Sequence, residues 1–292
     1  MRTLRPVLSI GIVLITFAAA ANTSGRVFAD GFKGPENLAF DGKGGLYVTD
    51  TDHLWKVATN GKASVIYTRD PKSDGKSICG VCIGPEGRIF FSASNRILKL
   101  NPADNSIAEI AGGFGLANGI TINDRGDLFI ADMGGKTLSV VPAGAKQARA
   151  LKTKVGMING VKWDRAKNIL YYTISAPGKL AGFRLNDKLE IVESITVAKF
   201  LFAALDDFTM DVNGNFYVCE WKGGKIVKVG ADGVKSVLLE GIDGPSAVAF
   251  GVGDFSGKLF ICVKGGSFKF NGTQLITAET DAKGYRMPFL QP

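Results

Sequence analysis

Six positions along the chain carry side chains whose types and spacing could form one polar site. They are Glu36, Cys79, Asn118, Asn159, Asp206 and Ser246, and successive members lie 43, 39, 41, 47 and 40 residues apart. Each is followed by apolar residues at the second and fourth positions after it, then by a turn and a second apolar run. Four of the six carry carboxylate or amide oxygens, which are the ligands that hard divalent cations prefer.

A repeat of about 40 residues made only of strand-like runs is typical of β-propeller blades with four strands each. No copy shows a helical period, so each small sheet needs neighbouring sheets to bury its two faces. The predicted third strands are "HLWKV", "RILKL", "TLSVV", "GFRL", "KIVKV" and "SFKF", and the predicted fourth strands include "ASVIYT", "ARALKT" and "KSVLLE". The sequence therefore predicts an all-β fold, a six-bladed propeller.

The two ends of the chain indicate how the ring closes. "RVFADGFKGPENLAF" near the N-terminus parallels "SVLLEGIDGPSAVAF" before the sixth copy. We therefore expect the strand from Arg26 to Ala29 to be the fourth strand of the last blade. The tail from about Thr273 has no repeat partner, and no place is predicted for it.

In a propeller, equivalent positions of the innermost strands surround the central channel, so the six residues should form a ring at one mouth. Taken singly they have ordinary explanations: Asn118 and Asn159 precede glycines, as in hairpin turns, and Glu36 and Asp206 could be solvated or capping carboxylates. Together, two carboxylates at a narrow mouth would repel each other unless a cation lay between them. With only one histidine in the chain, Ca²⁺ is the first expectation, and Zn²⁺, Mn²⁺ or Mg²⁺ are alternatives.

An outer rim is expected where the second strands end on the same face. It would contain Asp50, Asp132 and Glu220, with His53 in a nearby loop. These carboxylates could orient a polar substrate or act as a general base, or they could be turn residues. His53 is expected to be a loop residue, because a Ser-His-Asp triad would depend on it alone.

The N-terminal segment of the chain predicts that the protein is exported. Residues 1–21, "MRTLRPVLSIGIVLITFAAAA", have the charge, apolar run and small residues of a secretory signal peptide, which leaves 22–292 as the propeller domain. A secreted or periplasmic location follows, without a membrane span in the mature chain. The net charge is +8, but the lysines are scattered, so no nucleic-acid partner is expected. Oligomeric state is not indicated.

The four cysteines are too few for a disulfide scaffold. Three lie in apolar runs, which favours buried thiols. The Cys79-x-x-Cys82 pair lacks the partners of a zinc site, and its pairing is left open.

At this point several motifs resemble the gluconolactonase and senescence-marker-protein family, to which regucalcin and luciferin-regenerating enzyme belong. The motifs are "GPENLAFD", "NGITINDRGDLFIAD", "NGVKWDRAKNILYYT" and "LDDFTMDVNGNFYV". The resemblance implies a six-bladed propeller with one divalent metal ion in the channel. It implies Glu36, Asn159 and Asp206 as metal ligands, and Asn118 near the metal and the substrate.

Two positions depart from that family's pattern. Leu205-Asp206-Asp207 stands in place of Pro-Asp-Gly, so either aspartate could face the ion, although alignment favours Asp206. Leu116 stands where sugar-lactone members carry an arginine, and with Phe114 it indicates a more apolar ligand.

The resulting prediction is a metal-dependent hydrolase of lactones or simple esters, acting on a small molecule. The ion would polarise the carbonyl, Asn118 would donate to it, and Asp206 or a rim carboxylate would activate water. The alternative is a secreted, non-catalytic calcium-binding propeller that captures a ligand or partner.

Overall fold

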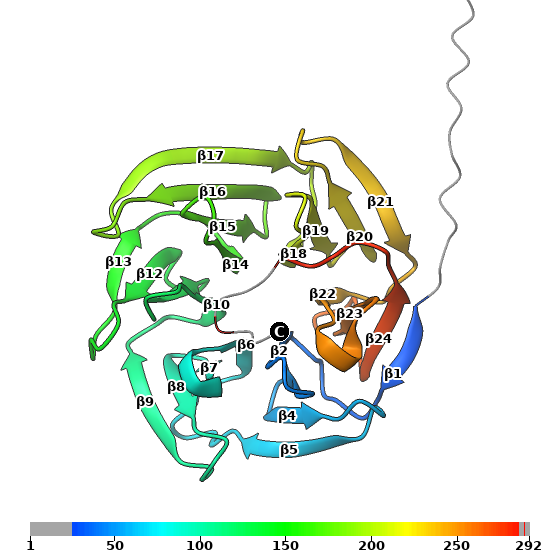
Figure 1. The fold of residues 1–292 in the computed structure, drawn as a ribbon, viewed down its shortest axis with the longest axis horizontal. Helices are drawn as coiled ribbons and strands as arrows, with labels where there is room; N and C mark the ends of the chain where they lie inside the picture. The colour runs from blue at the N-terminus through cyan, green and yellow to red at the C-terminus, as the bar shows by residue number, and fades with distance from the viewer. Residues whose placement is uncertain (1–24, 286–288, 290–292) are drawn as a thin grey trace, which may run out of the picture.

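The computed structural model describes residues 25–285 and 289, and the predicted signal peptide lies outside this range. Six four-stranded antiparallel sheets surround a central channel (Figure 1), which confirms the six-bladed propeller. The innermost strands are β2 (Asn37–Phe40), β6 (Ile78–Ile83), β10 (Ala117–Ile122), β14 (Ile158–Asp164), β18 (Leu205–Met210) and β22 (Pro245–Phe250). The second strands are β3 (Leu46–Thr49), β7 (Ile89–Ala93), β11 (Leu128–Asp132), β15 (Ile169–Ile174), β19 (Phe216–Glu220) and β23 (Lys258–Val263).

The outer half of each blade is formed by two further strands. The third strands are β4 (His53–Val57), β8 (Arg96–Leu100), β12 (Thr137–Val141), β16 (Lys179–Leu185), β20 (Lys225–Val229) and β24 (Gln274–Glu279). The outermost strands are β5 (Ala63–Thr68), β9 (Ile107–Gly112), β13 (Arg149–Lys152), β17 (Ile191–Lys199), β21 (Lys235–Glu240) and β1 (Arg26–Ala29). Two short 3₁₀ turns complete the elements, η1 (Pro85–Gly87) and η2 (Gly253–Phe255).

Burial explains the apolar runs of the inner strands. Every residue of β6, β10 and β11 is buried, because both faces of an inner strand pack against neighbouring blades, whereas β5 and β13 at the circumference are largely exposed. Aromatic pairs join the blades: Phe129 stacks on Trp163, with ring centroids 5.4 Å apart. Tyr171 meets Phe216 edge to face at 4.8 Å.

The ring closes in the last blade as predicted, but its third strand differs from the prediction. β1 pairs with β24, with Arg26 opposite Thr277. "SFKF" (267–270) is not a strand but part of the loop between β23 and β24, and Gln274–Glu279, in the tail for which no place was predicted, is the third strand. The cause is local: Gly265 has a φ of 96° and starts a loop that carries the chain away from the sheet.

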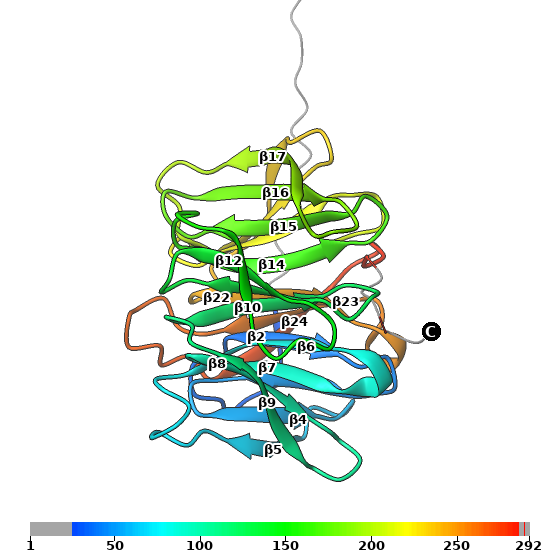
Figure 2. The same cartoon turned by 90° about the vertical axis from the view of Figure 1, so that its left-hand side faces the viewer.

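The loops leave the ring on two opposite faces (Figure 2), and the segment 280–285 lies at the face where the inner strands end. The mouth that holds the predicted site is on the other face, where the inner strands begin. Within the part of the chain that the structure describes, no helix is long and apolar enough to cross a membrane.

Candidate functional site at the channel mouth

The predicted ring of six residues begins the inner strands. Cys79, Asn118, Asn159, Asp206 and Ser246 are each the second residue of their strand, and Glu36 directly precedes β2. In these five strands the pairing register shifts at this position, which marks a β-bulge, a device that re-aims side chains. The interpretation of the two Asn-Gly pairs as hairpin turns is therefore wrong, because both pairs lie inside strands at bulges.

Hydroxyl groups from the second strands hold several of these bulges in place. Thr173 accepts from the backbone N–H of Gly160 at 2.9 Å and donates to the carbonyl of Asp206 in the next blade at 2.6 Å. Ser92 links Gly80 to Asn118 in the same way, and Thr49 donates to the carbonyl of Cys79. These hydroxyls tie neighbouring blades together at the height of the site.

Four of the predicted residues converge across the channel, although they belong to different blades. Asn118 donates to Oε1 of Glu36 at 3.4 Å, over a sequence separation of 82 residues. The amide of Asn159 donates to Ser175 at 3.2 Å, and both Asn159 and the charge of Glu36 influence the pKa of the Asp206 carboxyl. Burial, together with Glu36, raises the pKa of Asp206 well above its ordinary value.

A fifth residue, Lys264, was not predicted. It directly follows β23, its side chain is partly buried, and its ammonium forms an ion pair with Oε2 of Glu36. Burial alone would lower the pKa of Lys264, but the charges of Glu36 and Asp206 outweigh that effect and raise the pKa above its ordinary value. We call Glu36, Asn118, Asn159, Asp206 and Lys264 the mouth site.

The oxygens of the mouth site fit a hard divalent ion. Two carboxylates and two amides supply oxygen ligands of the kind that Ca²⁺ uses. The amide oxygen of Asn159 is buried and has no hydrogen-bond donor among the described residues, so it is available to a cation. The described residues contain no cluster of three His, Cys, Asp or Glu side chains that could hold a metal, so an ion here would depend on amide oxygens.

The two consecutive aspartates have different surroundings. Asp206 belongs to the mouth site, whereas Oδ2 of Asp207 accepts from Asn37 at 2.9 Å and from Lys162 at 2.6 Å. Asn37, Lys162 and Asp207 form a second group across the channel, which we call the polar layer. The structure therefore places Asp206, and not Asp207, with the other predicted ligands.

The rim carboxylates of blades 1 and 3, Asp50 and Asp132, accept hydrogen bonds from the backbone of nearby turns. Asp50 accepts from the backbone N–H groups of Lys33, Asp52 and His53 and from the indole of Trp55. Asp132 accepts from three backbone N–H groups, those of Gly115, Leu116 and Gly135. Glu220 lies 3.5 Å from Lys225. His53, the first residue of β4, lies beside Asp50 and packs edge to face on Trp55.

Apolar side chains lie in the loops that follow β19 and β23 and in the loop that precedes β18. Phe268 and Phe270, in the loop after β23, contact Trp221 with ring centroids 5.4 and 6.0 Å apart. Leu201 and Phe202, in the loop before β18, are 86% and 97% exposed, the largest values among the exposed apolar residues described. We call these five residues the apolar collar.

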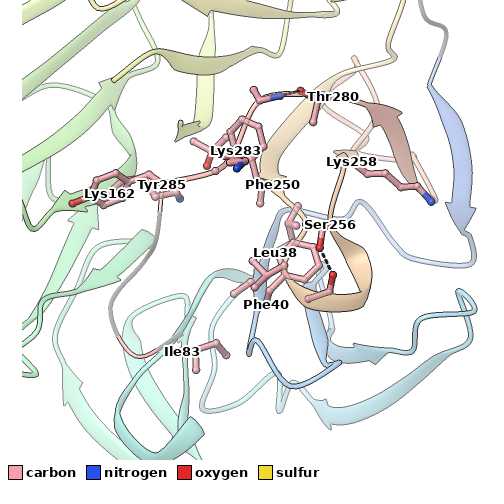
Figure 3. A pocket seen from close by; sticks show the side chains of 18 of the residues that line it. Leu38, Phe40, Ile83, Lys162, Phe250, Ser256, Lys258, Thr280, Lys283 and Tyr285 are labelled. Atoms are coloured by element: carbon pink, nitrogen blue, oxygen red, sulfur yellow. Dashed lines mark hydrogen bonds between the residues drawn. The ribbon is translucent and has the colours of Figure 1, made fainter. Parts of the chain in front are cut away.

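A large cavity of about 640 Å³ lies at the other end of the channel (Figure 3). Its walls are the far ends of the inner strands, such as Phe40 and Phe250, and the segment 280–285. Lys162 of the polar layer also lines it, but no residue of the mouth site does. The polar layer therefore lies between this cavity and the mouth.

The four cysteines are buried and free, so Cys79 and Cys82 are not joined. Burial raises the pKa of each of these two thiols to about 12. Neither thiol is a nucleophile near neutral pH.

Known structures share this architecture. Regucalcin of Agrobacterium tumefaciens, described as a calcium-binding protein, superposes with a TM-score of 0.76 at 13% identity, covering 92% of this chain and 98% of that one. A gluconolactonase of Xanthomonas campestris gives 0.74 at 15% identity, with 91% and 94% covered. Luciferin-regenerating enzyme gives 0.70 at 20% identity, with 88% and 95% covered. At these identities the likeness concerns the fold.

Comparison at the level of sequence is more specific. No curated protein matches the chain. The model of the SMP-30/Gluconolactonase/LRE-like region, however, matches residues 31–264, a span that begins just before Glu36 and ends at Lys264. The chain belongs to the SMP-30/gluconolactonase/LRE-like family.

Proposed function

We propose that the protein is a hydrolase of lactones or simple esters that works with a divalent ion, Ca²⁺ in the first place, held by Glu36, Asn159 and Asp206. The family supports a lactonase-type hydrolase with a small-molecule substrate. The observation that carries the ion site is the buried, donor-free amide oxygen of Asn159 beside two carboxylates. When bound, the ion would polarise the substrate carbonyl and stabilise the negative charge that develops on its oxygen.

The residues of the chain supply the remaining parts of the reaction. The amide of Asn118, which donates to Glu36, faces the same oxygens and can donate to the carbonyl oxygen of the substrate. Asp206 or the rim carboxylate Glu220 accepts a proton from the attacking water, because Asp50 and Asp132 are already saturated by backbone N–H groups. The water adds to the carbonyl carbon, and the ring or ester C–O bond breaks as the leaving oxygen takes up a proton.

The surroundings of the mouth favour substrates with an apolar part. Leu116 contributes no charge that could bind sugar hydroxyls, and Phe114 is buried beside it. The apolar collar offers exposed aromatic and aliphatic surface at the same face. We therefore expect alkyl- or aryl-substituted lactones and esters to be hydrolysed faster than aldonolactones.

The test compares the ion-free protein with protein given Ca²⁺, Zn²⁺, Mn²⁺ or Mg²⁺, with proton release followed on a panel of lactones and aryl esters. We expect ion-dependent turnover that falls by roughly 100-fold or more in Asp206→Asn. The matched control is Asp211→Asn, because Asp211 is a buried aspartate that follows the far end of the same strand. The Asp211→Asn variant should keep the turnover of the wild type.

Two outcomes would contradict the proposal. Turnover that does not respond to ions would remove the metal from the mechanism. Thermal stabilisation by an ion without turnover on any substrate would favour the non-catalytic binding propeller instead.

A further inference from the structure

Lys264 brings a fixed positive charge among the oxygens that fit a divalent ion. Its side chain is only 16% exposed, and its ammonium contacts Oε2 of Glu36. The other side of the ammonium faces the ring of Phe270, 4.3 Å from the centroid. An aromatic face and a carboxylate together stabilise a partly buried ammonium.

Lys162, the other partly buried lysine near the site, cannot supply this charge to Glu36 and Asp206. Lys162 is bound to Asp207 in the polar layer, at 2.6 Å. Among the described residues, the positive charge that acts most strongly on both Glu36 and Asp206 is therefore that of Lys264. In the absence of an ion, the ammonium of Lys264 compensates the charge of Glu36.

Lys264 does not satisfy the whole set of oxygens. The amide oxygen of Asn159 stays without a donor, although an ammonium has three N–H groups to give. A divalent ion at these oxygens would find the side chains of Asn159 and Asp206 accessible as ligands. At Glu36, however, it would have to displace the ammonium of Lys264. Two cations at such short separation in a buried site repel strongly, because the surroundings screen them poorly.

We propose that Lys264 is a built-in competitor of the divalent ion, which occupies Glu36 when the ion is absent and lowers the affinity of the mouth site for it. The inference rests on the proposed ion site. When the ion binds, the ammonium leaves Glu36 and remains against Phe270, towards the mouth. The ion at this site is consequently exchangeable, because the ammonium of Lys264 compensates the charge of Glu36 once the ion has left.

The experiment measures the dissociation constants of Ca²⁺ and Mn²⁺ by isothermal titration calorimetry for the wild-type protein and for Lys264→Met. Methionine keeps the unbranched apolar stem and removes the charge. We expect Lys264→Met to bind at least tenfold more tightly, which corresponds to about 1.4 kcal/mol. Lys264→Arg, which keeps the charge, should bind as weakly as the wild type.

Two further variants control for indirect effects. Lys33→Met removes one positive charge from the same face, at a lysine that is 66% exposed and pairs with Asp52, so it should leave ion affinity within about twofold of wild type because exposed charges are screened. Lys264→Met combined with Asp206→Asn should lose the gain, which places the tighter binding at the mouth site. If Lys264→Met does not fold, Lys264→Gln removes the same charge and keeps a donor towards Glu36.

The outcomes separate this inference from the proposed function. Equal affinities in wild type and Lys264→Met, or tighter binding in Lys33→Met as well, would overturn the competition while leaving the hydrolase intact. A tenfold gain with no hydrolysis on any substrate would support the competition and remove the enzyme. Absence of ion binding in both proteins would overturn the competition and the metal dependence together.

Discussion

The ionisation of Asp206 depends strongly on its surroundings. Asp206 is buried at the bulge of β18. Its burial and the negative charges of Glu36 and Asp207 favour the protonated form of its carboxyl and raise its pKa. Lys264 and Asn159 act in the opposite direction, but the net effect is a raised pKa. Without an ion, the folded protein therefore holds a proton on Asp206 at pH values where the unfolded chain has released it.

This raised pKa predicts a pH dependence of stability. The contribution of Asp206 is fully present below its unfolded pKa of 3.8 and is lost as the pH rises through the folded pKa, by about 1.4 kcal/mol for each pH unit between the two values. Ion-free wild type should therefore lose stability relative to Asp206→Asn as the pH rises from 4. Urea unfolding of both proteins across this pH range measures the difference.

Addition of the divalent ion should reverse the trend, because an ion binds the deprotonated carboxylate and so stabilises the folded protein more at higher pH. Asp211→Asn serves as the control, since it alters a buried aspartate without touching the mouth site. Identical pH profiles for wild type and Asp206→Asn would show that Asp206 is an ordinary carboxylate.

Among the strands, β15 has a particular part in shaping the site. Thr173 is buried, and its hydroxyl bonds at once to the peptide after Asn159 and to the carbonyl of Asp206. One side chain thereby fixes the relative position of two predicted ligands from neighbouring blades.

The change Thr173→Val keeps the shape and removes the hydroxyl. We expect it to lower the free energy of unfolding by about 1–3 kcal/mol, because a buried N–H and a buried carbonyl lose their partner, and to weaken ion binding. Thr173→Ser, which keeps the hydroxyl, should stay close to wild type in both measurements. Denaturant unfolding and calorimetric titration of the wild type and the two variants measure these effects. Equal unfolding free energies and ion affinities for Thr173→Val and Thr173→Ser would contradict the prediction.

The inner strands and the convergence of their first residues could be predicted from the sequence, because the period of about 40 residues and the apolar alternation both reflect burial on two faces. "SFKF" has the same alternation but lies in the loop that starts at Gly265, where Phe268 contacts Trp221 of the neighbouring blade and is 82% exposed. Alternation alone does not say what an apolar residue packs against.

Lys264 was missed for a related reason. It follows a second strand, as Ser175 does after β15, and Ser175 also reaches the site, where it accepts from Asn159 at 3.2 Å. A comparison of the residues that follow the six second strands would have found both. Alignment favours Asp206 over Asp207 as the ligand, but the separate partners of Asp207 could not be predicted, because a bulge lets consecutive side chains reach different partners.

The whole ring depends on the pairing of its two ends. β1 contributes the outermost strand of a blade whose other strands come from the end of the chain. Phe28 of β1 meets Phe255 and Phe260 edge to face, with ring centroids 6.1 and 5.1 Å apart. Its neighbour Val27 is half exposed.

Phe28→Ala should therefore loosen the closure. We expect a loss of about 2 kcal/mol, less than for a fully buried phenylalanine, and a fall in melting temperature of roughly 4–8 °C. Val27→Ala on the same strand should change stability by less than about 0.5 kcal/mol. Thermal denaturation followed by circular dichroism distinguishes them, and equal effects would show that β1 contributes only its backbone pairing.

This closure also sets the order in which the molecule can be completed during synthesis. Arg26 and Thr277, which face each other across the seam, are 251 positions apart. At about 5–20 residues per second a ribosome needs roughly 12 to 50 seconds to make that stretch. Throughout this time the first strand of the ring has no partner, so the ring closes only after the strand that contains Thr277 has been made, even where the earlier blades have already folded.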